Sequence, residues 1–294
     1  MDIKSFIKKA NQIEIKVRTA INSKMHGNFK SVFKGSGLDF KNLRLYQYGD
    51  DIRHIDWNTT AKGHGTFIKL YTEEKEQSVF FLVDSSASQL VGSKSKRKLD
   101  TAKEIMAVLT IAGINGGSQI GACFYSDKKD LLISPQGGQK NLYKILGEVA
   151  NFEAGENGTN LKDGLKFILN LLKKKSLIII ISDFLDKDYE DLLTAAKKKH
   201  DLILIQVLDK KELNFPKVGL VPIRDIERDE LQWVNTNSKK FRDWLKEEIE
   251  IKKDSLQSLC KKLEINYLEI ETGQNIIGPL VGLFNTRNKY GSKS

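Results

Sequence analysis

The sequence is poor in several residue types that would otherwise define its class. Cysteine occurs only twice in 294 residues, as Cys123 and Cys260, with no CxxC or Cys/His spacing that would indicate a zinc site. Proline occurs four times, and no Gly/Ser-rich or Pro-rich tract offers material for a disordered linker. We therefore expect a folded chain with two buried free thiols in a reducing cytoplasm.

Long apolar runs are also missing. The strongest lies around Leu177 to Ile181, far short of the roughly 20 residues that cross a bilayer. Residues 1–22 mix charges into their apolar positions, which is typical of an amphipathic helix and unlike the apolar core of a secretory signal. The sequence predicts no transmembrane segment and a cytoplasmic location.

Charge is unevenly distributed. The chain carries a net charge of +10, and residues 1–70 hold 13 Lys and Arg against 6 Asp and Glu. A basic face can attract nucleic acid, an anionic membrane or an acidic protein. These charges are scattered, however, without the stacking aromatics or helix-turn-helix pattern of a nucleic-acid reader, so a solvated surface is an equally good interpretation. Nucleic-acid binding is disfavoured, and a steep loss of binding with salt would be its signature.

From residue 78 onward, short β-branched runs alternate with longer helical patterns, which predicts an α/β fold. We expect a doubly wound, mostly parallel, Rossmann-like sheet over residues 78–286, a small β-containing appendage over 1–77 packed onto it, and a frayed basic tail over 287–294. Expected strands are 78–84, 119–126, 130–135, 176–183, 201–209 and 266–272, and expected helices are 99–114, 141–152, 160–174, 189–200 and 238–263. The second and third strands flank a short polar stretch and should form an antiparallel hairpin at one edge.

Oxygen-bearing side chains follow the predicted strands. Asp84, Ser86 and Ser88 alternate directly after the first strand, Asp183 ends a later one, and Thr159 stands in a loop before a helix. Ligands of open α/β sheets bind beyond the carboxyl ends of the strands, so these groups should converge. Hard oxygens without His or Cys suit Mg²⁺, with Mn²⁺ or Ca²⁺ as alternatives, and argue against zinc, copper or iron. The alternative is that the serines cap a helix and the aspartates merely end strands.

The same pattern resembles the metal-ion-dependent adhesion site of von Willebrand factor A-like domains, with all five expected positions filled. The resemblance implies that Asp84, Ser86 and Ser88 bind the cation directly. It implies further that Thr159 joins or leaves the coordination shell and that Asp183 acts directly or through water. In such domains a Glu or Asp of a protein partner completes the octahedron.

Residues 35–62 resemble the signature of the bacterial proteins grouped as domain of unknown function fifty-eight. The matching positions are Gly35, Gly37, Asp39, Phe40, Leu43, Arg44, Tyr46, Gly49, Asp50, Asp51, Arg53, Ile55, Asp56 and Trp57. This resemblance implies a MoxR-type AAA+ ATPase as partner, together with membrane-anchored relatives of the same domain, and no established enzymatic activity. We therefore expect a non-enzymatic, cation-dependent interaction module.

The 35–62 segment also offers a candidate partner surface. We expect the two carboxylates at 50 and 51 to pair with nearby arginines in a turn, and Trp57 to lie in the core of the appendage. The candidate surface residues are Arg44, Tyr46, Tyr48, Asp50, Asp51 and Arg53.

An enzymatic alternative is a magnesium-dependent phosphoesterase or nuclease that uses the same acidic cluster. Two-metal phosphoryl chemistry needs more carboxylates than the two predicted here. Serine catalysis is disfavoured because GxSxG is absent. Magnesium-dependent hydrolysis of phosphoesters would distinguish the alternative from an interaction module.

Overall fold

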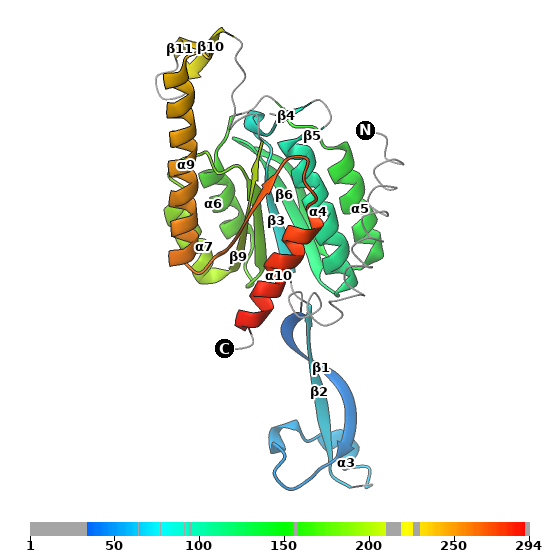
Figure 1. Ribbon diagram of the computed structural model, residues 1–294. Coiled ribbons are helices and arrows are strands. Elements are labelled where there is room, and N and C mark those ends of the chain that lie inside the picture. The colour runs from blue at the N-terminus through cyan, green and yellow to red at the C-terminus, as the bar shows by residue number, and fades with distance from the viewer. Residues whose placement is uncertain are drawn as a thin grey trace.

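The computed structural model describes residues 34–63, 65–76, 78–90, 92–93, 96–155, 158–209, 219–225 and 230–291 (Figure 1). The predicted helix over residues 1–22 lies outside these ranges.

Six strands form a central sheet in the order β12-β9-β8-β3-β6-β7. Their bounds are β3 Ser78–Asp84, β6 Gln119–Tyr125, β7 Lys129–Gln136, β8 Leu177–Ser182, β9 Asp201–Leu208 and β12 Asn266–Glu271.

The chain starts this sheet at its centre and winds outward in both directions. Strand β3 pairs in parallel with β6 on one side and with β8 on the other. Strands β9 and β12 continue the parallel arrangement beyond β8, and β7 adds an antiparallel edge beside β6. The prediction of a mostly parallel α/β sheet with one antiparallel hairpin at the edge is thus confirmed.

Strand β3 is buried on both faces because alternate side chains enter two separate cores. Val79, Phe81 and Val83 point into one core, and Phe80 and Leu82 into the other. Complete burial of side chains of this size stabilises the fold by roughly 1.5–3 kcal/mol each. A parallel strand covered on both faces needs an uninterrupted apolar run, which explains why these segments were recognisable in the sequence.

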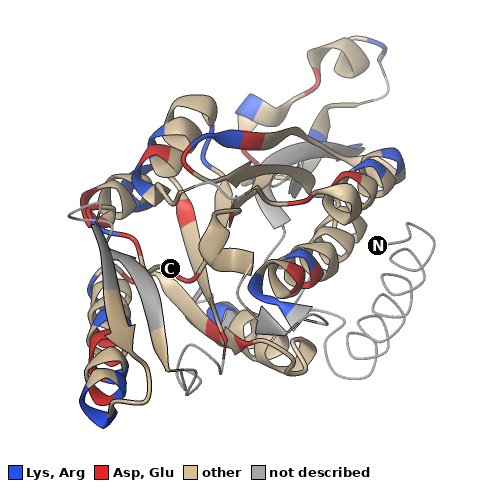
Figure 2. Ribbon diagram, turned by 90° about the horizontal axis from the view of Figure 1, so that it is seen from above, with Lys and Arg blue, Asp and Glu red and all other residues tan. Residues whose placement is uncertain are grey.

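Helices cover both faces of the sheet (Figure 1). One core is closed by α4 Lys98–Asn115, α5 Gly138–Asn151 and α10 Ile277–Gly291, and the other by α6 Leu161–Leu171, α7 Glu190–Lys199 and α9 Lys239–Lys262. The observed ends lie within about three residues of the predicted ones for all five predicted helices. Seen from above, Lys and Arg are interspersed with Asp and Glu along the outer helices (Figure 2). Such mixing is typical of a solvated surface.

The appendage is an antiparallel ribbon of β1 Lys34–Leu45 and β2 Phe67–Glu76. The segment between them holds the short 3₁₀ helix η1 Ile52–His54 and the single-turn helix α3 Trp57–Thr60. Figure 1 shows this ribbon projecting beyond the sheet instead of lying on it. The expectation that it packs onto the main domain is therefore wrong for the described residues, because β2 ends one residue before β3 and directs the ribbon away along that strand.

The C-terminal part also departs from expectation. A hairpin of β10 Leu220–Asp225 and β11 Glu230–Asn235, which was not predicted, precedes α9. Helix α10 continues to Gly291, so the predicted frayed tail is helical up to that residue. Buried Leu280 and Phe284 fix α10 to the core, and Arg287 forms an ion pair with Asp201 in β9, which holds the last turns.

None of the helices in the described ranges combines the length and apolar character that bilayer crossing requires.

Candidate functional site

The candidate site lies at the carboxyl ends of β3 and β8, the two neighbouring strands from which the chain winds in opposite directions. The parallel register pairs Val83 with Ile181, so Asp84 and Ser182 follow at the same level of the sheet. The Ser182 hydroxyl donates to Asp84 Oδ2 over 2.7 Å. Loops that leave such a point diverge, and the space between them is the usual ligand crevice of an open α/β sheet.

The loop after β3 folds back on its own first carboxylate. The backbone N–H of Ser86 donates to Asp84 Oδ1 over 2.9 Å, and the Gln89 amide donates to Asp84 Oδ2 over 3.2 Å. The hydroxyl oxygens of Ser86 and Ser88 lie 3.0 Å apart. Asp84 and Ser86 are buried and Ser88 is half-buried. The loop therefore presents two adjacent hydroxyl groups beside a carboxylate whose orientation is fixed.

Asp183 follows β8 and is held by a lysine that the sequence analysis did not single out. Lys98, the first residue of α4, places its Nζ 2.7 Å from Asp183 Oδ2, and both side chains are almost fully buried, at 0% and 1% exposure. The backbone N–H of Leu185 donates to the other oxygen, Asp183 Oδ1, over 3.3 Å. Both carboxylate oxygens of Asp183 thus already accept hydrogen bonds from the protein.

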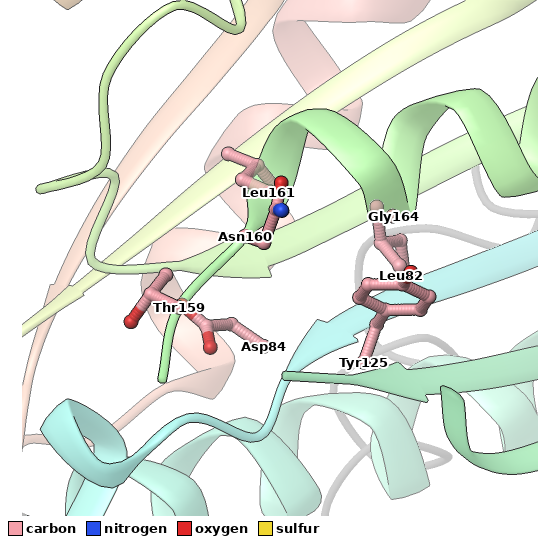
Figure 3. Close-up of a pocket in the computed structure, with 7 residues that line it drawn as sticks. All are labelled: Leu82, Asp84, Tyr125, Thr159, Asn160, Leu161 and Gly164. Carbon is pink, nitrogen blue, oxygen red and sulfur yellow. The ribbon is translucent and has the colours of Figure 1, made fainter. Parts of the chain in front are cut away.

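Thr159 lies in the loop that enters α6 and faces the same crevice. It lines a small pocket with Asp84, beside which it lies in Figure 3, while Tyr125 and Gly164 form the opposite side. The cavity volume is about 10 Å³, enough for about one water molecule. Asp186, from the loop after β8, accepts the backbone N–H of Leu161 over 2.7 Å. This bond joins the loop that carries Thr159 to the loop that carries Asp183.

Burial and like charge together perturb Asp84. Its removal from water and, second, the nearby charge of Asp183 raise the pKa of the carboxyl from 3.8 to about 6. Hydrogen bonds from Ser86 and Ser182 oppose this shift. A positive charge placed in the crevice would stabilise the ionised form of Asp84.

The donor set fits a hard divalent cation. In an octahedral shell with metal–oxygen distances of about 2.1 Å, neighbouring oxygens are about 3.0 Å apart. The Ser86 and Ser88 hydroxyl groups, which are hydrogen-bonded to each other, have this separation between their oxygens. No group of three or more His, Cys, Asp or Glu side chains gathers anywhere in the described residues, so a cation here would rest mainly on neutral oxygens.

The structure brings the five predicted ligands to one end of the sheet, in two groups. Asp84 and Thr159 line the small pocket, and Ser86 and Ser88 lie beside Asp84 in the loop after β3, whereas Asp183 is held by Lys98. Sequence reasoning missed Gln89, Ser182 and Lys98. Ser182 and Gln89 were detectable as neighbours of predicted ligands, whereas Lys98 ends the basic stretch GSKSKRK at residues 92–98, which carries no sign of a buried ion pair.

The second predicted surface is the segment between β1 and β2. Arg44 binds Asp50 through two hydrogen bonds of 2.7 and 2.8 Å, and Arg53 binds Asp51 over 2.6 Å. The hydrogen bond from Arg44 lowers the pKa of the Asp50 carboxyl. The prediction of an ion-paired turn is confirmed.

Apolar side chains are exposed on this turn. Trp57 is 68% exposed, so its predicted core position is wrong. Asp56 caps α3 by accepting from two backbone N–H groups, and this turns Trp57 outward at the first helical position. Tyr48, Leu45 and Ile52 are also exposed, whereas Tyr46 is half-buried.

Comparison with known proteins identifies relatives over most of the chain. The uncharacterized protein Rv1480 of Mycobacterium tuberculosis (strain ATCC 25618 / H37Rv) and the uncharacterized protein Mb1516 of Mycobacterium bovis are each 27% identical over 218 residues, which is 73% of this chain and 69% of theirs. Among solved structures, the conserved hypothetical protein BatB from Bacteroides thetaiotaomicron matches 72% of this chain and 99% of its own, with 14% identity and a TM-score of 0.47. The family model described as "Protein of unknown function DUF58" matches residues 42–254, and the chain belongs to that family.

Proposed function

We propose that the protein is a non-enzymatic interaction module of the von Willebrand factor A-like type, in which one divalent cation, Mg²⁺ or else Mn²⁺ or Ca²⁺, joins it to an acidic group of a protein partner. The observation that carries the proposal is the pair of Ser86 and Ser88 hydroxyls, 3.0 Å apart beside the buried Asp84. This spacing matches one edge of an octahedral shell.

Each residue has a separate task in this proposal. Asp84 supplies negative charge, and the Ser182 hydroxyl and Gln89 amide hold its carboxylate in place. Ser86 and Ser88 supply neutral oxygens, and Thr159, which lines the small pocket beside Asp84, offers a further hydroxyl. A bound Mg²⁺ would act as a Lewis acid toward a partner carboxylate. Ser88 is only half-buried, so in this proposal the partner carboxylate approaches the cation from its side.

We propose a MoxR-type AAA+ ATPase as the partner, on the basis of the family resemblance in residues 35–62, with membrane-anchored relatives as further partners. The ion-paired turn would contribute a second contact through Arg44, Tyr46, Tyr48, Asp50, Asp51 and Arg53. Its internal ion pairs fix the backbone while Tyr48 and Trp57 remain exposed. Rigid exposed aromatic and arginine side chains are typical centres of protein interfaces.

The test compares two serines of one loop. Mn²⁺ binding is measured by electron paramagnetic resonance for the wild type, for Ser86→Ala and for the matched control Ser85→Ala. Ser85 stands next to Ser86, but its hydroxyl donates to Asp130 over 2.6 Å and plays no part in the proposed shell. We expect Ser86→Ala to weaken Mn²⁺ binding at least about tenfold and Ser85→Ala to retain it. Equal binding by all three proteins would contradict the proposed site.

A second experiment tests the partner and the rival chemistry. The wild type and both serine variants are used to capture the AAA+ ATPase from native lysate, with and without EDTA. Recovery by metal-loaded wild type and Ser85→Ala alone supports cation-mediated docking, and equal recovery from every sample contradicts it. Magnesium-dependent phosphoester hydrolysis that is lost in Asp84→Ala would instead support the phosphoesterase or nuclease alternative.

A further inference from the structure

Lys98 is buried at a position where a cation is normally unfavourable. It is the first residue of α4, at 0% exposure, and the amino-terminal end of a helix already carries partial positive charge. A buried ammonium costs several kcal/mol unless an anion compensates it closely. Asp183, which follows β8 and stands 85 residues later in the chain, provides that anion at 2.7 Å. Helix α4 could cover the apolar core without a buried ion pair between Lys98 and Asp183.

The pair divides the two carboxylates of the candidate site into different roles. Asp183 gives one oxygen to Lys98 and the other to the Leu185 backbone. Asp84 instead accepts from neutral groups, namely the Ser86 N–H, the Gln89 amide and the Ser182 hydroxyl. None of these three donors carries a positive charge that would compensate the Asp84 carboxylate.

We infer that the Lys98 ammonium supplies a fixed positive charge to the site, which neutralises Asp183 and keeps this carboxylate out of direct metal coordination. A bound divalent cation therefore retains surplus positive charge with which it attracts an acidic ligand. This inference rests on the proposed function and deepens it. With Lys98, Asp84, Asp183 and a divalent cation, the site carries a net charge of +1. Without the lysine charge it would be neutral and would attract an anion less.

The inference predicts two effects of opposite sign from one substitution. Removing the ammonium leaves two uncompensated carboxylates, so the divalent cation should bind more tightly. The loaded site loses its surplus charge, so an external carboxylate should bind more weakly. A lysine that only stabilised the fold would not shift the two affinities in opposite directions.

Mn²⁺ alone and then acetate serve as probes. Mn²⁺ affinity is measured by electron paramagnetic resonance, and acetate binding to the loaded protein by water-proton relaxation, for wild type, Lys98→Met and the charge-preserving control Lys98→Arg. For Lys98→Met we expect Mn²⁺ affinity to rise and acetate affinity to fall, each at least about tenfold, because charges at this range interact strongly when buried. For Lys98→Arg we expect both within about threefold of wild type. Unchanged or weaker Mn²⁺ binding by Lys98→Met overturns the inference.

A double variant covers the case in which Lys98→Met does not fold. Lys98→Met with Asp183→Asn removes both charges and restores the net charge of the wild-type site. If Asp183 stays outside the coordination shell, Mn²⁺ affinity remains within about threefold of wild type. A loss of more than tenfold would show that Asp183 is itself a ligand and overturn the inference. Absence of Mn²⁺ binding by the wild type would instead refute the proposed function, which separates the two failures.

Discussion

Replacement of Asp84 by Asn tests whether the site holds a carboxylate that is costly to ionise. In metal-free buffer the folded protein must place this negative charge in a buried position close to Asp183. Asparagine has nearly the same shape and cannot ionise. The Asp84→Asn variant should therefore gain stability relative to wild type as the pH rises.

The magnitude follows from the pKa difference between folded and unfolded protein. The pKa of Asp84 is about 6 in the fold and 3.8 ordinarily, a gap of about two units. One unit corresponds to about 1.4 kcal/mol. Because the folded pKa is raised, the penalty is absent below about pH 3.8, grows through the interval, and is complete above about pH 6. Between pH 4 and pH 7.5 the relative stability of Asp84→Asn should rise by about 2 to 3 kcal/mol.

Urea unfolding of both proteins in EDTA at several pH values measures this difference. Differences between Asp and Asn that do not depend on ionisation cancel when the pH values are compared, and those that do are already included in the raised pKa of Asp84. Asp163 supplies a control of opposite sign, because the hydrogen bond from Lys166 lowers the pKa of its exposed carboxyl. Asp163→Asn should lose relative stability with rising pH. A pH-independent difference for Asp84→Asn would refute the reasoning.

Three further predictions concern the packing, the thiols and the turn. Gly121→Ala should destabilise the protein by about 1–3 kcal/mol in urea unfolding, because a Cβ there would lie 2.8 Å from the Pro135 backbone nitrogen. The control Gly147→Ala, with nothing within 4 Å in helix α5, should be neutral or stabilising. Burial raises the pKa of Cys123 and of Cys260 to about 12, so neither thiol should react with a disulfide reagent at pH 8 until the protein unfolds. Rapid reaction of either in the native protein would contradict this. Trp57→Ala should change stability by less than about 0.5 kcal/mol while weakening capture of the proposed ATPase partner, and a large loss of stability would indicate that Trp57 is packed.

The sheet was predictable because its strands are fully buried. Runs such as residues 177–181 are apolar at every position. Neither a surface helix nor a solvated loop needs such a run, so it indicates a strand that is buried on both faces. Residues around the site were predictable for a related reason, since strand ends in a parallel sheet meet at one edge. Asp84 and Asp183 could therefore be placed together from strand order alone.

Other features depend on tertiary contacts that leave no local pattern. The pairing of Lys98 with Asp183 joins residues 85 positions apart, and a basic turn before a helix gives no sign of it. Trp57 is turned outward by one capping carboxylate, which the general preference of aromatics for the core does not reveal. Helix α10 runs from Ile277 to Gly291, and its second and third residues are Gly278 and Pro279. Glycine and proline weaken the prediction of a helix unless they fall in its first turn, as they do here.

The position of β2, which ends one residue before β3, sets how far apart the two proposed binding surfaces lie. Strand β2 ends at Glu76, β3 begins at Ser78, and β3 delivers Asp84 at its far end. Seven residues of strand span roughly 23 Å, and the ten residues of β2 add to that length. The turn with Trp57 and the crevice of Asp84 therefore lie at opposite ends of the molecule (Figure 1). A compact partner domain of about 100 residues has a radius of gyration of only about 13 Å. One domain of that size does not reach both proposed surfaces, so their simultaneous use by such domains would require two of them, for example in two subunits of one ring, with this chain as the spacer between them.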